Sequence, residues 1–494
     1  MSTALATLRA LPARTAGRGL RRRLCADALP AADCVKFGHV VQAHHRCRKH
    51  LVHTNILHSH WLSQETGSQI VLKMEQQQFT GSFKERGACN ALLSLSSEVS
   101  RAGVKAASAG NHALALSYHG ANLGIVCHRR LNRHPSLQTR RPQAVDHKTL
   151  LSLHAPPPCR LLSPRPLSAP PRQPVTVVMP TVAPLAKVDK CRALGANVIV
   201  HGAHIGEAKE WAMSSPEFEG MHYINGYDDP EIIAGAGTLA IEALEKVADL
   251  DAIIVPVGGA GLIAGVALAV KTLNPAIRVI GVEPKRCASF AAALEAGRPV
   301  PVDVAPTLAD GLAVPCVGPH AFAVARQFVD EMVQVDESEV ALAVLRLVEL
   351  EKLVVEGGGA AGLAAILPGG PLDRPDLKGK KVLVPLCGGN IDTTVLGRVI
   401  ERGLAADGRL VRLVASVSDR PGGIAELTRR IYEQGASVKD IFHERAWLFS
   451  SVDQVRVKVV LETLGKAHNE RILAALRDAV TEVYIESDSM YTRF

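Results

Sequence analysis

Residues 251–262 read Asp-Ala-Ile-Ile-Val-Pro-Val-Gly-Gly-Ala-Gly-Leu, an apolar run that ends in a glycine-rich turn. Such a run suits a strand buried on both faces of a parallel sheet, and 262–273 has the length and spacing of the helix that should follow. The runs 278–284 (RVIGVEP) and 380–388 (KKVLVPLCG) repeat the pattern, and 337–353 has helical spacing between them. Strands that alternate with helices predict an α/β fold with its ligand site at the carboxyl ends of the strands.

The composition is that of an ordinary globular protein and excludes two classes. Of 494 residues 47% are hydrophobic and 21% charged. No run approaches the roughly 18 apolar residues of a membrane-spanning helix, so an integral membrane protein is excluded. The ten cysteines form no paired clusters, which argues against a disulfide scaffold and for a reducing compartment.

The net charge of +8 arises from one segment, Val126–Gln173. It contains eight Arg and Lys148 against a single acid, Asp146, so the rest of the chain is balanced and a nucleic-acid partner is not expected. The segment also holds nine Pro and has no sustained period. Its removal would join 123–125 to 174–180 and restore an uninterrupted turn and buried strand. We therefore predict a disordered insertion at 126–173.

The two ends of the chain predict separate units. Residues 1–34 form an N-terminal extension whose first 26 residues hold six Arg and no acid, as in a mitochondrial or plastid transit peptide. A disordered tail is the alternative, so both a cytoplasmic and a mitochondrial location remain open. In the last 85 residues we expect strands at 410–417, 437–444, 454–462 and 481–485 and helices at 424–434 and 466–479. This βαββαβ order is that of the ferredoxin-like split unit.

One candidate catalytic residue is a lysine directly after a tight polar turn. Residues 80–88 read Thr-Gly-Ser-Phe-Lys-Glu-Arg-Gly-Ala, which places Lys84 at the predicted start of a helix. Apolar surroundings there would lower the pKa of the amine by desolvation, as a Schiff-base lysine requires. Taken alone, a surface lysine at a helix start is the commoner case.

Two turns of small residues are candidate anion sites. Ser108–His112 (SAGNH) opens the helical segment 113–120, and Val257–Leu262 (VGGAGL) opens the helix after the first strand. Small side chains let backbone N–H groups approach an anion, and the helix dipole adds to the attraction. The second turn lacks the GxGxxG spacing of a dinucleotide site, so a single phosphate is expected. The structural alternatives are a side-chain helix cap and a close-packed strand–helix turn.

A fourth motif, Cys387-Gly388-Gly389-Asn390, ends the last predicted strand of the α/β region. Cys387 by itself is equally well explained as a small buried hydrophobe. The histidine-rich stretch 39–60 lacks the regular spacing of zinc ligands, so no metal site is expected.

In this order the four motifs resemble those of the fold-type II pyridoxal-phosphate enzymes, most closely the threonine/serine dehydratase (threonine ammonia-lyase) family with a C-terminal ACT regulatory domain. Residues 54–59, 72–75, 282–284 and 308–311 support the resemblance. It implies a catalytic domain of two parallel-sheet α/β subdomains at 35–403, an ACT domain at 409–490, and pyridoxal 5'-phosphate as cofactor. The chain departs from the family at Asn55, usually Pro, and at Ala260, usually a Gly. Ala260 still supplies its N–H, so phosphate binding is weakened only if this position needs a positive φ.

The resemblance also implies a role for each candidate residue. Lys84 would bind the cofactor covalently and later move the Cα proton of the substrate, and Asn111 would hydrogen-bond the phenolic oxygen of the cofactor. Cys387 would face its pyridine nitrogen, and Phe83 would also contact it. The amides of Gly258, Gly259, Ala260, Gly261 and Leu262 would hold its phosphate. The substrate carboxylate would be bound by Ser108, Ala109, Gly110 and His112.

Those roles imply a β-elimination. A thiol cannot keep the pyridine nitrogen protonated as an aspartate would, so the ring is a weaker electron sink and concerted loss of a β-hydroxyl is favoured. The expected reactions convert L-threonine to 2-oxobutanoate, or L-serine to pyruvate, with release of ammonia. Such enzymes serve amino-acid catabolism or isoleucine biosynthesis.

Two alternatives and a regulatory site follow from the same resemblance. Serine racemase shares the scaffold but uses a Ser directly before the Gly-Asn pair as a second acid–base, where this chain has Ala109. A catalytically inactive amino-acid-binding homologue, damaged by the insertion, is the other alternative. The family forms homo-oligomers, and its ACT turn would bind an amino-acid effector through Asp419, Arg420, Gly422 and Gly423. An oligomerisation module without a ligand is the simpler explanation of that turn.

Overall fold

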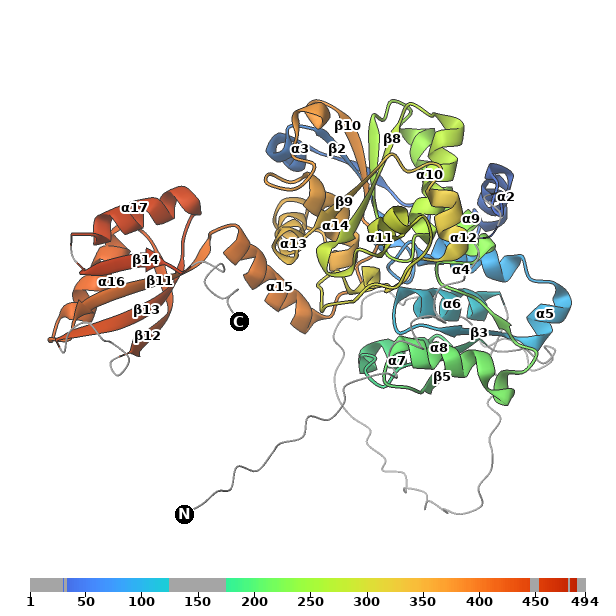
Figure 1. Cartoon of the computed structure of the whole chain (residues 1–494), viewed down its shortest axis with the longest axis horizontal. Coiled ribbons are helices and arrows are strands. Elements are labelled where there is room, and N and C mark those ends of the chain that lie inside the picture. The colour runs from blue at the N-terminus through green and yellow to red at the C-terminus, as the bar shows by residue number, and fades with distance from the viewer. Residues whose placement is uncertain (1–29, 31–32, 124–174, 445–452, 479, 487–494) are drawn as a thin grey trace, which may run out of the picture.

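The structure, a computed structural model, describes residues 30, 33–123, 175–444, 453–478 and 480–486. The predicted transit peptide and the predicted insertion at 126–173 lie outside the described residues. The strands of the described residues form three sheets: one of six strands, and two of four strands each. The two largely parallel sheets lie in the larger body of Figure 1, and the C-terminal antiparallel sheet forms the smaller body beside it.

The six-stranded sheet confirms the predicted buried strands. Its order is β1-β2-β10-β7-β8-β9, with β1 antiparallel to β2 and every other pair parallel. The strands are β1 (Ile56–Ser59), β2 (Gln69–Lys73), β7 (Ala252–Pro256), β8 (Arg278–Pro284), β9 (Glu331–Val335) and β10 (Lys381–Pro385). Strands β7, β8 and β10 coincide with the three apolar runs, which read as continuous because helices cover both faces of the sheet.

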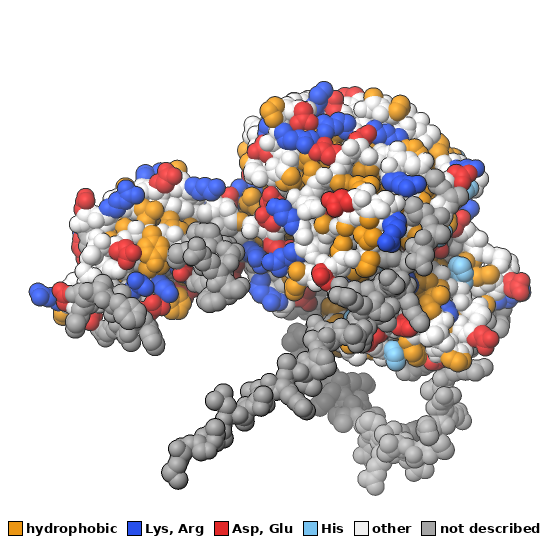
Figure 2. All heavy atoms as spheres, in the orientation of Figure 1, with side chains coloured by type: hydrophobic (Ala, Val, Ile, Leu, Met, Phe, Trp, Pro, Cys, Tyr) orange, Lys and Arg blue, Asp and Glu red, His pale blue; other side chains and the backbone are white. Residues whose placement is uncertain are grey.

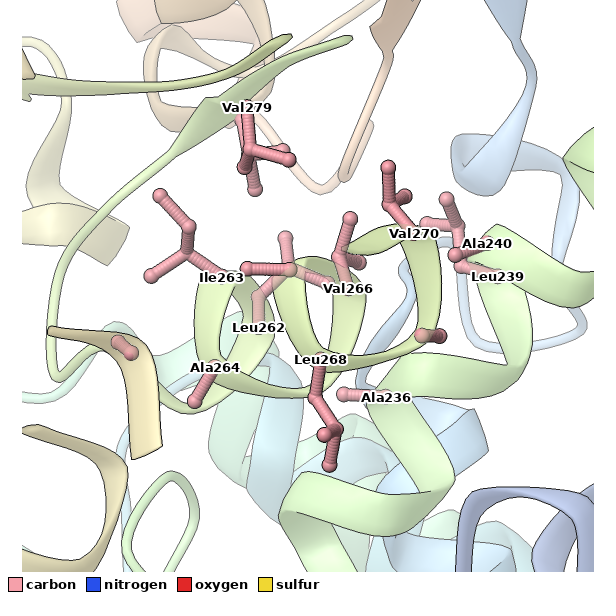
Figure 3. Close-up of a cluster of buried hydrophobic side chains, with 14 of the residues drawn as sticks. Ala236, Leu239, Ala240, Leu262, Ile263, Ala264, Val266, Leu268, Val270 and Val279 are labelled. Atoms are coloured by element: carbon pink, nitrogen blue, oxygen red, sulfur yellow. The ribbon is translucent and has the colours of Figure 1, made fainter. Parts of the chain in front are cut away.

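Alternate residues of β7 point into different cores. Ile253 and Val255 belong to one cluster of buried side chains, and Ala252 and Ile254 belong to another. The first cluster holds α9 (Pro230–Lys246), α10 (Gly261–Leu273) and α12 (Pro319–Ala325); the second holds α13 (Glu337–Glu351) and α14 (Gly357–Ile366). Figure 3 shows Leu262, Ile263 and Val266 of α10 in one cluster with Val279 of β8 and with Leu239 and Ala240 of α9. Helices on both faces make this a doubly wound layer.

The four-stranded parallel sheet has the order β5-β4-β3-β6. Its strands are β3 (Val104–Ala107), β4 (Val175–Met179), β5 (Asn197–Val200) and β6 (His222–Tyr223). One core of this subdomain holds α4 (Lys84–Leu93), α6 (Asn111–Asn122) and α7 (Leu185–Ala193), and a smaller one holds α8 (Ile205–Ser214). The remaining helices are α2 (Phe37–Cys47), α3 (His60–Thr66), α5 (Ser97–Ala102), α11 (Ser289–Ala296) and α15 (Thr393–Ala406).

The C-terminal unit has the predicted βαββαβ order. It runs β11 (Leu410–Ser418), α16 (Gly423–Glu433), β12 (Ser437–Glu444), β13 (Gln454–Glu462), α17 (Lys466–Leu476) and β14 (Glu482–Ile485). The sheet is antiparallel, in the order β12-β13-β11-β14, and both helices pack their apolar residues on it. Helix α15 joins this unit to the larger body, and at its end Asp407 forms an ion pair of 2.7 Å with Arg346 of α13.

The surface has a mixed charge. Basic and acidic side chains are interspersed over the face shown in Figure 2. Within the described ranges no helix combines the length and the apolar character that a bilayer crossing requires.

Candidate active site

The turn after β10 meets the start of α4 and, through Asn390, the turn after β3. The Phe83 backbone N–H donates to the Cys387 carbonyl oxygen over 3.0 Å, and Ser82 forms an antiparallel bridge with Gly388. These contacts bring the lysine motif beside the Cys387 turn, although some 300 residues separate them. Glu356, in the turn before α14, contacts Asn111 at the start of α6. The predicted lysine, SAGNH and CGGN motifs thus form one site.

Lys84 is half-buried at the first position of α4 and lacks a carboxylate partner among the described residues. Its Nζ donates to the Gly226 carbonyl oxygen over 2.6 Å and lies 5.1 Å from the centroid of the Phe83 ring. Burial lowers the pKa of the amine to about 8, and the negative charge of Glu356 opposes this shift. The amine is therefore available in both protonation states near neutral pH, in line with the desolvation expected from the sequence.

Asn111 is held at both ends of its carboxamide. Its Nδ2 donates to Glu356 Oε1 over 2.7 Å, and its Oδ1 accepts from Asn390 Nδ2 over 2.9 Å. Sequence reasoning missed Glu356 and gave no role to Asn390. A signal for Glu356 existed, because Val355–Gly359 reads VEGGG and resembles the other glycine-rich turns.

The SAGNH turn opens α6 without a side-chain cap, so the helix-cap alternative is wrong. Gly110 is the N-cap and no side chain accepts there; the Ser108 Oγ instead accepts from the Gly110 N–H over 3.3 Å. A Cβ built on Gly110 meets no atom within 4 Å, so there is open space beside this turn. The buried His112 Nε2 donates to the Ile224 carbonyl oxygen, and burial lowers its pKa to about 3, so the ring is neutral. Ala109 has no proton to give.

The glycine-rich turn after β7 is closely packed and also presents backbone N–H groups at the start of α10. A Cβ at Gly259 would lie 2.2 Å from the Tyr227 ring, so the close-packed-turn explanation holds for this residue. No acceptor within the described part of the chain engages the backbone N–H groups of residues 258–262, which remain free at the N-terminus of α10. Ala260 has φ +72°, a left-handed conformation that favours glycine. This position therefore has the positive φ at which an alanine in place of glycine is expected to weaken phosphate binding.

Cys387 is buried at the end of β10, where its Sγ lies 3.5 Å from the Pro385 carbonyl oxygen. Burial raises the pKa of the thiol well above its ordinary value, and the carboxylates Glu75 and Glu356 add to the effect. The thiol is neutral at physiological pH and offers no charge to a ligand.

The site fits a phosphorylated, aldehyde-bearing cofactor. Buried polar atoms of Thr80, Ser82 and His112 find no hydrogen-bond partner in the described residues. Thr80 and Ser82 precede Lys84 in the same turn, and His112 is close enough for the Lys84 charge to lower its pKa. The free amides after β7 supply an anion cradle at a helix N-terminus. A primary amine of lowered pKa, a phosphate cradle and unpaired polar atoms are the groups that pyridoxal 5'-phosphate needs.

The described residues contain no group of three or more His, Cys, Asp and Glu side chains that could hold a metal ion. The predicted effector turn lies between β11 and α16. There the Asp419 N–H donates to the Asp453 carbonyl oxygen, the Arg420 N–H donates to the Ser418 Oγ, and Gly422 has φ +104°. Gly423 begins α16, which has 11 residues.

Comparison with known proteins gives the family. The profile of the pyridoxal-phosphate dependent enzymes matches residues 48–140 and 172–388, and leaves out 141–171 within the predicted insertion. The L-threonine ammonia-lyase of Thermotoga maritima is 39% identical over 428 residues, which cover 86% of this chain and 94% of that protein. The processed form of threonine deaminase isoform 2 from Solanum lycopersicum superimposes with a TM-score of 0.61 at 30% identity, covering 74% of this chain and 92% of that one. Maize serine racemase gives 0.61 at 28% identity, with 75% and 98% covered. The chain belongs to the family of pyridoxal-phosphate-dependent enzymes.

Proposed function

We propose that this protein is a pyridoxal-phosphate-dependent ammonia-lyase that acts on L-threonine or L-serine. The observation that carries the proposal is the Lys84 amine, with its lowered pKa, among the SAGNH turn, the free amides after β7 and the neutral Cys387 thiol. The similarity to proteins named L-threonine ammonia-lyase and threonine deaminase supports the choice of substrate.

Each motif has a task in that reaction. The bound cofactor supplies a conjugated ring that withdraws electrons and so acidifies the Cα–H bond of an amino acid. The amides of residues 258–262 bind its phosphate, and Asn111 offers it the Nδ2 hydrogen that Glu356 does not use. The open space beside Gly110 accommodates the carboxylate of a small amino acid.

Proton transfer falls to Lys84. With a pKa of about 8, its Nζ can accept a proton as the amine and return it as the ammonium near neutral pH. The Cys387 thiol stays neutral and gives no charge to the ring nitrogen, which favours early departure of a β-hydroxyl group over a long-lived carbanion.

The test is ammonia and 2-oxo-acid release from L-threonine and L-serine by the purified protein. Lys84→Ala should abolish both, whereas Lys246→Ala, a change in the last turn of α9 away from the site, should leave them unchanged. A Lys84→Ala protein with near-wild-type release would refute the assignment. Wild-type protein that binds amino acids without the visible absorbance of bound cofactor would favour the inactive binder.

Serine racemase activity is the second candidate, because the maize serine racemase shares the fold over most of this chain. Ala109 offers no acid–base group where that activity would need one on the second face of the substrate. Ala109→Ser should therefore introduce D-serine formation from L-serine. Comparable D-serine formation by the wild type would overturn the preference for elimination.

We also propose that the C-terminal unit is an ACT domain that binds an amino-acid effector in a homo-oligomer. The βαββαβ order and the Asp419–Gly423 turn support this assignment. Truncation after Asp407, which keeps the ion pair of that residue with Arg346, should preserve catalysis and remove any response to added amino acids. An unchanged response after truncation would refute the regulatory role.

A mitochondrial location is the remaining proposal from the sequence. The arginine-rich, acid-free first 26 residues support it. Residues 1–34 fused to a fluorescent protein should direct it to mitochondria, and a diffuse signal would favour the cytoplasm.

A further inference from the structure

Glu356 is a buried carboxyl group without a cationic partner in the described residues. Two other buried carboxylates have a cationic partner: Glu75 and Glu242 both bind the Arg86 guanidinium, at 2.7 and 2.8 Å. Leaving a carboxyl group in a dry site without a counter-charge costs stability, so its presence calls for a role that an apolar residue cannot fill. Its hydrogen-bond partner is Asn111, the residue that the family resemblance places against the cofactor.

The geometry fixes which way the Asn111 carboxamide faces. Glu356 Oε1 can only accept from Nδ2, while Asn390, whose Nδ2 also donates to the Thr80 carbonyl oxygen over 2.6 Å, donates to Oδ1. A flipped amide would place two N–H donors together at Asn390, whose own orientation is fixed by the Thr80 carbonyl oxygen, so only one orientation satisfies all three residues. One Nδ2 hydrogen then remains free. Asn111 can offer a bound ligand a donor, not an acceptor.

The backbone also confines the carboxyl group. A Cβ at Gly388 would lie 2.4 Å from Glu356 Oε1 and 3.1 Å from Asn111 Nδ2, so only glycine admits both groups beside the Cys387 turn. The Glu356 N–H donates to the Gly388 carbonyl oxygen over 2.9 Å. The turn that begins at Cys387, the predicted cofactor contact, therefore also places the Glu356 side chain.

The charged surroundings leave Glu356 able to accept in either protonation state. Burial and the Asp310 charge raise its pKa to about 7, while hydrogen bonds from Asn111 and the Asn390 backbone and the charge of Lys187 oppose the shift. Lys84 and Cys387 also lie within electrostatic reach of it. A protonated carboxyl group keeps a carbonyl oxygen, so Oε1 can hold Asn111 on both sides of neutrality.

We propose that Glu356 is a positioning residue, which orients Asn111 so that its free Nδ2 hydrogen points at an acceptor oxygen of the cofactor. The proposal rests on the proposed function and deepens it. It also predicts that the oxygen facing Asn111 accepts a hydrogen bond from Nδ2 and donates none to it.

The test is a double-mutant cycle read out as the Kd of the apo-protein for pyridoxal 5'-phosphate, measured by calorimetry. Glu356→Leu removes the acceptor and should raise Kd about fivefold to tenfold, the value of one oriented hydrogen bond. In an Asn111→Ala background the same change should raise Kd less than about twofold, because its target is gone. Glu356→Gln keeps an acceptor oxygen and should stay within about twofold of the wild type.

The controls separate positioning from a general loss of structure. Glu339→Gln removes another carboxyl group whose pKa burial raises, but in the α13 capping box, where Gln also serves; it should leave Kd unchanged. If Glu356→Leu does not fold, Glu356→Met replaces it. An equal loss of affinity in both backgrounds, or a loss with Glu356→Gln as large as with Glu356→Leu, would overturn the proposal. The cycle measures cofactor binding without turnover, so failure of the proposed ammonia-lyase activity would appear separately, in the oxo-acid assay.

Discussion

The Lys84 Nζ donates to the Gly226 carbonyl oxygen over 2.6 Å, so the amine is held by a neutral backbone acceptor and not by a carboxylate. A backbone carbonyl fixes the position of the amine without compensating its charge. Burial therefore outweighs the opposing charge of Glu356, and the pKa of the amine falls to about 8. Because the buried amine is protonated less readily than in the unfolded chain, it lowers the stability of the apo-protein near neutral pH.

Lys84→Met should stabilise the apo-protein near pH 7 by about 2 kcal/mol, after allowance for the lost hydrogen bond to Gly226. The pKa of this amine is lower in the folded chain than in the unfolded chain. The unfolded chain thus binds more protons between about pH 8 and pH 10.5, and stability rises with pH across that window. The gain from Lys84→Met should shrink near pH 10. Urea unfolding at the two pH values measures it, with Lys246→Met as a surface control; an equal gain at both would show that charge is not the cause.

The strands and the separate motifs of the site were predictable because each is a local pattern in the sequence. Apolar runs such as 278–284 are buried strands, and glycine-rich turns such as 387–390 lie at their carboxyl ends. Glu356 and Gly226 escaped prediction because their partners, Asn111 and Lys84, lie far away along the chain and only the tertiary fold joins them. The helix expected over 337–353 ends earlier, at Glu351, because Lys352 adopts a left-handed conformation. The sequence has no glycine at this position that would have predicted the end of the helix.

Ala260→Gly should stabilise the protein by about 1 kcal/mol. Ala260 has φ +72°, and a left-handed conformation costs a residue with a Cβ roughly 1–2 kcal/mol, from which the entropy cost of glycine must be subtracted. Thermal unfolding of the apo-protein measures the change. Ala264→Gly, inside the same helix at ordinary φ, should instead destabilise by about 1 kcal/mol or more. Destabilisation by both changes would mean that packing of the Ala260 methyl group outweighs its backbone strain.

A buried cluster of charges next to the site gives a third prediction. The Arg86 guanidinium, two residues after Lys84, makes paired hydrogen bonds of 2.7–2.8 Å with Glu75 and with Glu242, and the Lys73 Nζ donates to Glu242 over 2.8 Å. The ion pairs lower the pKa of Glu242 to about 2, although burial opposes this. Because the four residues come from β2, the turn after it, α4 and α9, no sequence pattern announces the cluster.

Glu242→Gln should destabilise the protein by about 3 kcal/mol, because it leaves two buried cations with a single carboxylate. In the wild type this contribution is complete above about pH 4.5 and is lost as the pH falls toward 2, since the pKa of Glu242 is lowered in the folded chain. Urea unfolding at neutral pH measures the loss. Glu426→Gln, at an exposed ion pair with Arg429, should leave the free energy of unfolding almost unchanged. Equal losses of unfolding free energy from Glu242→Gln and Glu426→Gln would show that burial does not strengthen the ion pairs of the cluster.

The connection between α6 and β4 carries the last prediction. Strands β3 and β4 pair in parallel, with Val104 opposite Val175, and α6, which ends at Asn122, crosses between them. Connections of this kind usually have about two to six residues. Deletion of 126–173 would leave Gly124, Ile125 and Pro174 between Leu123 and Val175, which is within that range.

Deletion of 126–173 should stabilise the protein and raise its yield while leaving its affinity for pyridoxal 5'-phosphate unchanged. Shortening the connection to three residues should recover about 2–3 kcal/mol of loop-closure entropy. The connection enters β4 at its amino end, whereas Ser108 and Asn111 follow the carboxyl end of β3. The residues joined by the deletion therefore lie at the opposite end of these parallel strands from the site. A chain with the sequence of 126–173 scrambled is the control and should behave like the wild type. A deleted chain that unfolds or loses the cofactor, together with a scrambled chain that does the same, would show that this segment is an integral part of the domain and that the strand beginning at Val175 depends on it.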